Sequence, residues 1–162
     1  MRRPEAGTAE FNRLKFLLLR KKADSMMPHV FVYGTLRRHG RNDIARFRPA
    51  PVFVGEASIA GTLYDLGTYP GIVLDGAGRV RGEVYRIEPV VEAALDLLEE
   101  VAEDDSGEYI KREVRVAVGA QRLDCLVYEI HPSRMKGHPG IGGGDWIAHA
   151  AQKSPVFSPP KD

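Results

Sequence analysis

Short runs of β-branched and aromatic residues recur through the middle of the chain and predict β-strands. They cover residues 29–33, 52–66, 71–74, 80–87, 109–118 and 123–130. Residues 75–78, Asp-Gly-Ala-Gly, predict a hairpin turn between the third and fourth runs, and residues 119–121, Gly-Ala-Gln, predict another between the last two. Connections this short favour an antiparallel or mixed sheet that curls or closes.

One further segment has the periodicity of a helix. Pro89 opens residues 90–103, whose apolar positions recur at i, i+3, i+4 and i+7 and predict a core-facing stripe of Val91, Ala94, Leu95, Leu98, Val101 and Ala102. A second, shorter helix is predicted over 146–152, because the carboxylate of Asp145 suits the N-cap position. Strands and helices together indicate an α+β fold.

The two ends of the chain differ from this central part. With 162 residues, 43% of them hydrophobic, the chain is long enough for one domain and too short for two. We assign the domain to residues 27–152 and expect a proline-rich tail at 153–162. Residues 1–26 contain the basic run FNRLKFLLLRKK, where a loose, flexible extension is favoured over a basic amphipathic helix that touches a membrane or a partner.

Charge and cysteine content exclude several classes of protein. Lys and Arg number 23 and Asp and Glu number 22, so the net charge of +1 does not demand nucleic acid or an anionic membrane as a partner. The apolar run 16–19 is too short for a membrane span or a signal sequence. The single cysteine, Cys125, lies in an apolar run, which predicts a buried inert thiol and excludes a disulfide framework. A cytoplasmic protein is therefore expected.

The predicted central helix offers several carboxylates, and the helical angle separates them. At about 100° per residue, Glu99 falls on the flank of the apolar stripe and Glu100 falls on the solvated side. Glu99 is either a boundary carboxylate paired with a base or a group at the rim of an apolar cavity. In the second case, desolvation raises its pKa and suits a proton shuttle near neutral pH.

A glycine turn ends the first predicted strand, in the sequence Tyr-Gly-Thr-Leu at 33–36. Successive backbone N–H groups that leave a sheet there can point at one anion, but these residues alone favour a plain strand-to-loop turn. The glycine-rich residues 137–144 lack the Lys-Ser/Thr pair of a phosphate loop and predict a flexible loop. His131, His138 and His149 match no metal-ligand spacing, so no metal site is expected.

Strand parity within residues 109–118 places one arginine on the apolar side. Arg112 shares parity with Ile110 and Val114, so its side chain is predicted to turn toward the core. A buried guanidinium needs a carboxylate partner, and we favour a structural role for this pair over contact with a substrate.

Six segments, taken in order, resemble the γ-glutamylcyclotransferase-like family, and within it the small bacterial AIG2-like or YtfP-like branch. They are VFVYGTLR at 30–37, LGTYPGIV at 66–73, GEVYRI at 82–87, LDLLE at 95–99, GEY at 107–109 and GDW at 144–146. The resemblance implies a small mixed, mostly antiparallel β-barrel with flanking helices and a cavity at one end. It implies no cofactor.

The activity implied by the resemblance is cyclisation of a γ-glutamyl amine or γ-glutamyl amino acid to 5-oxoproline, with release of the free amine. The implied general acid and base is Glu99, and the residues implied to bind the small-molecule substrate are Tyr33, Gly34, Thr35, Leu36, Tyr69, Gly71 and Tyr109. The alternative is a non-catalytic small-molecule binding or regulatory protein on the same fold, and the retained glutamate favours the enzyme. The oligomeric state, monomer or weak dimer, stays open.

The chain departs from the family pattern at two places. Glu100 replaces the glycine of the usual LDxxEG, which is expected to alter the end of the helix or the mouth of the cavity. The usual Tyr-x-Arg reads Tyr109-Ile110-Lys111-Arg112 here, so either Lys111 takes the place of the arginine or the strand register differs.

Overall fold

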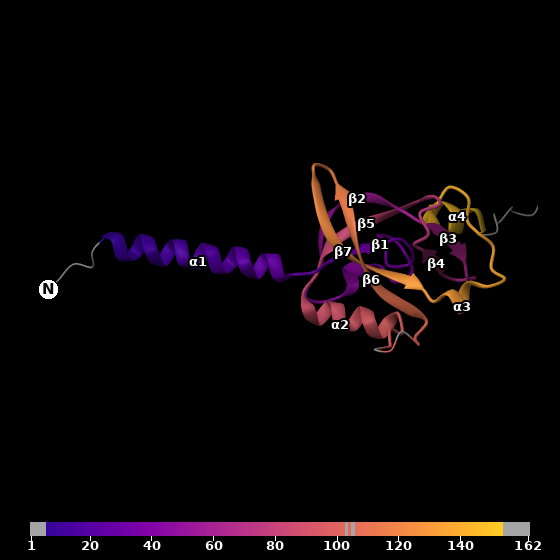
Figure 1. The fold of residues 1–162 in the computed structure, drawn as a ribbon, viewed down its shortest axis with the longest axis horizontal. Coiled ribbons are helices and arrows are strands. Elements are labelled where there is room, and N and C mark those ends of the chain that lie inside the picture. The colour runs from indigo at the N-terminus through magenta and orange to yellow at the C-terminus, as the bar shows by residue number, and fades with distance from the viewer. Residues whose placement is uncertain (1–5, 103, 105, 154–162) are drawn as a thin grey trace, which may run out of the picture.

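The computed structural model describes residues 6–102, 104 and 106–153, and seven strands in it form a single sheet (Figure 1). The strands are β1 His29–Val32, β2 Val52–Ala60, β3 Thr62–Asp65, β4 Pro70–Val73, β5 Arg79–Arg86, β6 Tyr109–Val118 and β7 Gln121–Ile130. Neighbouring strands follow the order β2-β5-β1-β7-β4-β3, and β6 pairs along the other edge of β7.

The sheet is mixed and mostly antiparallel, as predicted. β1 and β4 are both parallel to β7, whereas the remaining pairs are antiparallel. The sheet curls so that β6 approaches β2, and Val118 of β6 lies against Gly55 of β2. These two strands form no ladder in the described part of the chain. The sheet is therefore a barrel only in a loose sense, because side chains and not ladder hydrogen bonds connect β6 to β2.

Strand pairing corrects one predicted strand and one predicted hairpin. The run 52–66 is two strands, which separate at Gly61. Residues 75–78 form a turn but no hairpin, because β4 pairs with β3 and β7 while β5 pairs with β1 and β2. Turn chemistry is local, whereas the choice of partner strand depends on the whole sheet. The second predicted hairpin is confirmed, since Gly119, with a φ of 57°, and Ala120 join β6 to β7.

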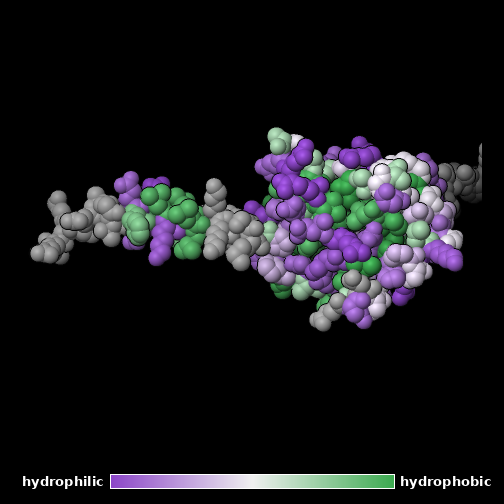
Figure 2. Space-filling model, in the orientation of Figure 1, coloured by the Kyte–Doolittle hydropathy of each residue, from purple (hydrophilic) through white to green (hydrophobic). Residues whose placement is uncertain are grey.

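The described residues form the α-helices α1 Ala6–Met26, α2 Pro89–Leu98, α3 Pro132–Met135 and α4 Trp146–Lys153, and the 3-10 helix η1 Ile44–Arg46. α1 extends away from the sheet (Figure 1), and its described side chains, at 9–19, are exposed and mix hydrophobic with hydrophilic residues (Figure 2). The segment is therefore a continuous helix, and its flexibility stays a prediction. None of the described helices is both long and apolar enough to cross a membrane.

Alternate residues of β1 face two buried clusters, as the pleat of a strand requires. Val30 packs with Val91 and Leu95 of α2, and this cluster covers one face of the sheet. Phe31 belongs to the second cluster, which fills the opposite face and includes Trp146 of α4. The end of β1 therefore lies where both clusters meet.

α2 ends at Leu98, although the apolar periodicity predicted a helix that continues to residue 103. Glu99 is the C-cap residue, and Glu100 follows with a φ of 50°, the left-handed conformation that ends many helices. The amides of Glu100 and Val101 then donate to carbonyls of the last turn, which are the two bonds of a Schellman motif. The backbone therefore turns away from the helix axis directly after Glu99.

Two predictions about polar side chains have different outcomes. The N-cap is confirmed, because Oδ1 of Asp145 accepts hydrogen bonds from the amides of Ile147 and Ala148 at 3.1 and 3.3 Å. Arg112 has the expected carboxylate partner, with Nε 3.2 Å from Oε1 of Glu129, but the prediction of its burial is wrong, since 48% of its side chain is exposed. β6 is an edge strand, and a long side chain on it reaches past the sheet to water.

Candidate active site

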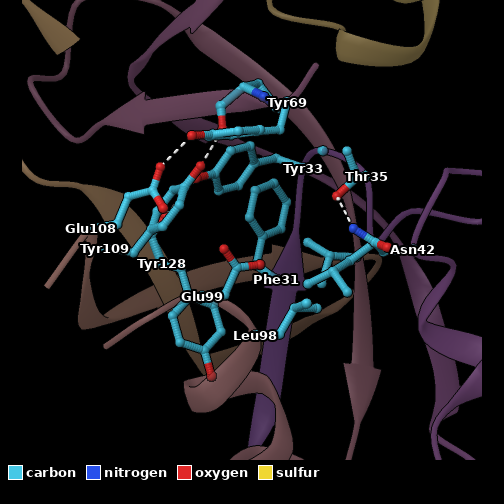
Figure 3. A pocket seen from close by; sticks show the side chains of 14 residues that line it. Phe31, Tyr33, Thr35, Asn42, Tyr69, Leu98, Glu99, Glu108, Tyr109 and Tyr128 are labelled. Atoms are coloured by element: carbon cyan, nitrogen blue, oxygen red, sulfur yellow. Dashed lines mark hydrogen bonds between the residues drawn. The ribbon is translucent and has the colours of Figure 1, made fainter. Parts of the chain in front are cut away.

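A cavity of about 130 Å³ opens where β1 ends, beside the C-terminal end of α2 (Figure 3). Every predicted site residue except Gly71 lines this cavity. Gly71 of β4 instead permits close strand packing, because a Cβ there would lie 2.6 Å from Cβ of Ile130 in β7. The lining residues are Phe31, Val32, Tyr33, Gly34, Thr35, Leu36, Asn42, Tyr69, Pro70, Leu98, Glu99, Glu108, Tyr109 and Tyr128.

The loop that follows β1 forms one wall of the cavity. Gly34 lies against Pro70, and a Cβ at this position would be 2.6 Å from the proline ring. The carbonyls of Gly34, Thr35 and Leu36 accept hydrogen bonds of 2.9 to 3.1 Å from amides farther along the loop. Within the described chain, the amides of the same three residues donate no hydrogen bond. The loop therefore leaves three successive N–H groups without a protein acceptor, which is the condition that an anion-binding turn requires.

Arg37 fixes this loop to two other segments. Its Nε lies 2.7 Å from Oε2 of Glu83 in β5, and its Nη1 lies 2.9 Å from Oδ1 of Asp145 at the start of α4. Glu83 also accepts from the amide of Arg38 at 2.9 Å and from the hydroxyl of Tyr85 at 2.8 Å. Arg37 and Glu83 are 6% and 5% exposed, so their ion pair is buried. Sequence reasoning missed this network, although Arg37, Glu83 and Asp145 belong to three of the six family-like segments.

Glu99 enters the cavity from the end of α2, and its half-buried side chain points inward (Figure 3). Among the described residues, nothing donates a hydrogen bond to its carboxylate. Burial first, and then the negative charge of Glu108, raise the pKa of Glu99 from 4.5 to about 7. A carboxyl group that titrates near neutral pH can both accept and return a proton.

Three buried tyrosines form the floor of the cavity, and their hydroxyl groups already have partners. Tyr33 donates to the carbonyl of Tyr128 at 2.5 Å. Tyr109 donates to the carbonyl of Pro70 at 2.7 Å, and Tyr128 donates to Oδ1 of Asp96 at 2.8 Å. Burial raises the pKa of all three phenols above the ordinary value. The three tyrosines therefore stay neutral, and their hydrogen bonds fix the floor of the cavity.

Glu108 is a second carboxylate in the cavity, and sequence reasoning assigned it no role. Its Oε1 accepts a hydrogen bond from the hydroxyl of Tyr69. That bond, together with burial, raises the pKa of Tyr69 to about 12. The backbone of Glu108 is also held, since its amide donates to the carbonyl of Glu100 at 3.1 Å and its carbonyl accepts from the amide of His131 at 2.9 Å. Glu108 is therefore fixed at the start of β6.

Lys111 faces α2 in the place where the family pattern has an arginine two residues after the tyrosine. Its Nζ lies 2.9 Å from Oε1 of Glu92 and 2.9 Å from Oδ2 of Asp96. Arg112 points elsewhere and pairs with Glu129. Lys111 therefore ties β6 to α2, and the β6–β7 register is unbroken from Tyr109 to Val118.

Outside the cavity, other reactive side chains have structural partners. Nε2 of His149 lies 2.7 Å from Oδ2 of Asp65. Cys125 is buried, as predicted, and burial raises the pKa of its thiol to about 11. The described residues contain no group of three or more His, Cys, Asp or Glu side chains placed to hold a metal ion. Apart from tyrosines, the ionisable groups that line the cavity in this part of the chain are Glu99 and Glu108.

Comparisons with known proteins agree on one family. The family described as γ-glutamyl cyclotransferase, AIG2-like, matches residues 30–148. The γ-glutamylcyclotransferase family protein YtfP of Escherichia coli K12 is 35% identical over 119 residues, which cover 73% of this chain and 95% of YtfP. The γ-L-glutamyl-butirosin B γ-glutamyl cyclotransferase of Niallia circulans is 41% identical over 80 residues, which cover 49% of this chain and 50% of that protein.

A solved structure extends the agreement to the fold. An AIG2-like protein from Mus musculus superimposes with a TM-score of 0.59 at 25% identity, over 74% of this chain and 88% of that one. The sequence match spans every segment that lines the cavity, from β1 to β7. This chain belongs to the γ-glutamyl cyclotransferase, AIG2-like family.

Proposed function

We propose that this cyclotransferase-type enzyme converts the γ-glutamyl group of a γ-glutamyl amine or γ-glutamyl amino acid to 5-oxoproline and releases the free amine. The observation that carries the proposal is a carboxyl group of pKa about 7, Glu99, in one cavity with the unpaired amides of residues 34–36. Membership of the family supports the same reaction.

The loop amides are suited to the negative ends of the γ-glutamyl group. Three successive N–H groups can hold its α-carboxylate, and a donor near the γ-carbonyl oxygen stabilises the negative charge that develops there during attack. One such donor contributes about 3 kcal/mol to the transition state. Because the amine and the carbonyl belong to the same bound molecule, the loop and the tyrosine floor only have to fold the substrate toward a five-membered ring.

Glu99 is proposed to relay the protons. Its carboxylate takes a proton from the α-ammonium of the substrate, which makes the amine nucleophilic. The amine nitrogen then bonds to the γ-carbonyl carbon, and the bond from that carbon to the leaving nitrogen breaks as Glu99 gives its proton to the leaving nitrogen. Glu99 then takes the second proton from the new ring nitrogen and passes it to the released amine. In total, two protons pass from the α-ammonium to the leaving amine, so the reaction consumes neither water nor a cofactor.

The activity is tested with a panel of γ-glutamyl amines and γ-glutamyl dipeptides, with chromatographic measurement of 5-oxoproline. We expect kcat/KM to rise with pH through about 7, because only the ionised form of Glu99 accepts the proton. Glu99→Gln should lower kcat/KM by a factor of about 100 to 10,000, the usual contribution of a general acid and base.

The matched control is Glu100→Gln, which removes the same charge one residue away at an exposed position. This variant should keep the activity of the wild type. Unchanged turnover by Glu99→Gln would contradict the assigned role of Glu99. Absence of 5-oxoproline from every substrate, together with tight calorimetric binding of γ-glutamyl compounds, would instead support a binding protein on the same fold.

A further inference from the structure

Glu108 has an oxygen that its structural hydrogen bond does not use. Oε1 accepts from Tyr69, whereas Oε2 accepts from no described residue. No buried side-chain oxygen or nitrogen in the described part of the chain lacks a partner, so Oε2 is open to the cavity or to water. No described Lys, Arg or His forms an ion pair with Glu108. The carboxylate is therefore available to a cation from outside the protein.

Glu108 lies on the side of the cavity that faces away from the loop. Figure 3 shows Glu108 and Tyr69 on one side, Thr35 and Asn42 on the other, and Glu99 between them. In the proposed reaction the loop holds the α-carboxylate, and the bond that breaks lies beside Glu99. The leaving amine then extends from Glu99 toward Glu108.

Aromatic side chains line the cavity between Glu99 and Glu108. Tyr33 and Tyr109 are buried, and Tyr69 is half-buried. A group that extends from Glu99 to Glu108 passes the rings of Tyr33, Tyr109 and Tyr69, so it meets aromatic surface before it meets the carboxylate (Figure 3). This order suits an alkyl chain that ends in a positive charge.

We infer that the leaving amine of the preferred substrate carries a second, protonated amino group at the end of a short alkyl chain, and that Glu108 binds this ammonium. The inference rests on the proposed function and narrows its substrate class to γ-glutamyl derivatives of diamines. Glu108 is then a specificity-determining residue, and Tyr69 is a positioning residue that holds one of its oxygens. Glu99 keeps its separate role beside the scissile bond.

Arg134 of α3 is the nearby cation that favours the opposite substrate class. Its positive charge reaches Tyr69 and lowers the pKa of that phenol, against the larger effects of Glu108 and burial. The Arg134 side chain is exposed, where water screens its charge. Glu108 lines the cavity and Arg134 does not, so the carboxylate of Glu108 is the closer of the two charges to a bound substrate.

The test uses the full chain and three γ-glutamyl amides of matched length, made from cadaverine, hexylamine and 6-aminohexanoate, whose far ends are positive, neutral and negative. We expect the wild type to turn over the cadaverine amide with a kcat/KM about tenfold above that of the hexylamine amide, as one charged hydrogen bond provides. Glu108→Gln should bring this ratio close to one. The ratio cancels any effect of the variant on Glu99, which both substrates share.

Glu100→Gln, with the same loss of charge outside the cavity, is the control and should keep the wild-type ratio. An unchanged ratio in Glu108→Gln overturns the inference, even where both substrates lose activity equally. Preference for the 6-aminohexanoate amide also overturns the inference, and indicates that Arg134 binds the far end of the leaving amine. If none of the three yields 5-oxoproline, the panel of γ-glutamyl amines and dipeptides decides the proposed reaction, and calorimetric affinity decides the inference. Tighter binding of the cadaverine amide that is lost in Glu108→Gln supports the inference, and equal binding of the three amides refutes it.

Discussion

The Glu99 carboxyl has a pKa of 4.5 in an unfolded chain and of about 7 in the cavity. Between these values the folded protein holds a proton that the unfolded chain has released. The stability linked to Glu99 is therefore fully present below pH 4.5 and is lost as the pH rises through about 7. The difference corresponds to about 3 kcal/mol in the free energy of unfolding. A proton shuttle at neutral pH thus has a cost in stability.

Glu99→Gln removes the ionisation and should raise the free energy of unfolding at pH 8 by up to about 3 kcal/mol, with little change at pH 4. Urea denaturation at the two pH values measures the difference. Glu100→Gln should show no such pH-dependent gain, because its side chain is exposed. The same effect of Glu99→Gln at both pH values would contradict the raised pKa.

The direction of Glu99 could be predicted from the sequence, because the angle between side chains of one helix is a local property. The cavity partner Glu108 could not be predicted in the same way. Tyr69, whose hydroxyl binds Glu108, is 39 residues away in the chain, and no periodicity connects the two. Loop amides at 34–36 were foreseen from the glycine turn, but not the buried Arg37 that holds the loop.

At the scale of elements, Glu100 occupies a position that favours glycine at the end of α2. Its φ of 50° brings Cβ close to the following carbonyl, at a cost of about 1 kcal/mol. Glu100→Gly should therefore raise the free energy of unfolding by about 1 kcal/mol, measured by urea denaturation at pH 7. Glu100→Ala removes the same charge but keeps Cβ, and should give no gain. Equal gains from both variants would attribute the effect to charge instead of backbone conformation.

Most strands could be predicted, because alternating burial depends on neighbours within the strand. The end of α2 could not, since Val101 and Ala102 continue its apolar pattern beyond the point where the backbone of Glu100 leaves the helix. The turn at 75–78 misled for a related reason. Its residues do form a turn, but β4 and β5 each pair with other strands.

For the whole molecule, Arg37 connects the β1 loop to β5 and to α4, segments 46 and 108 residues farther along the chain. Composition and pattern predicted a curled mixed sheet with flanking helices, but not what fastens them together. Such a contact between distant segments leaves no local pattern. Asp145 shows the limit: its role as N-cap of α4 was predicted, whereas its ion pair with Arg37 was not.

Arg37→Met keeps a similar volume but leaves Glu83 buried without its cation, and should lower the free energy of unfolding by about 3 to 5 kcal/mol. Arg81→Met is the control, because Arg81 also faces Asp145, at 3.6 Å, but is 63% exposed and should change stability by less than about 0.5 kcal/mol. Urea denaturation measures both. Equal, small changes in the free energy of unfolding would mean that the buried Arg37–Glu83 pair does not stabilise the fold. A large loss confined to Arg37→Met, with a raised KM for γ-glutamyl amides in the folded variant, would show that the substrate loop depends on this distant anchor.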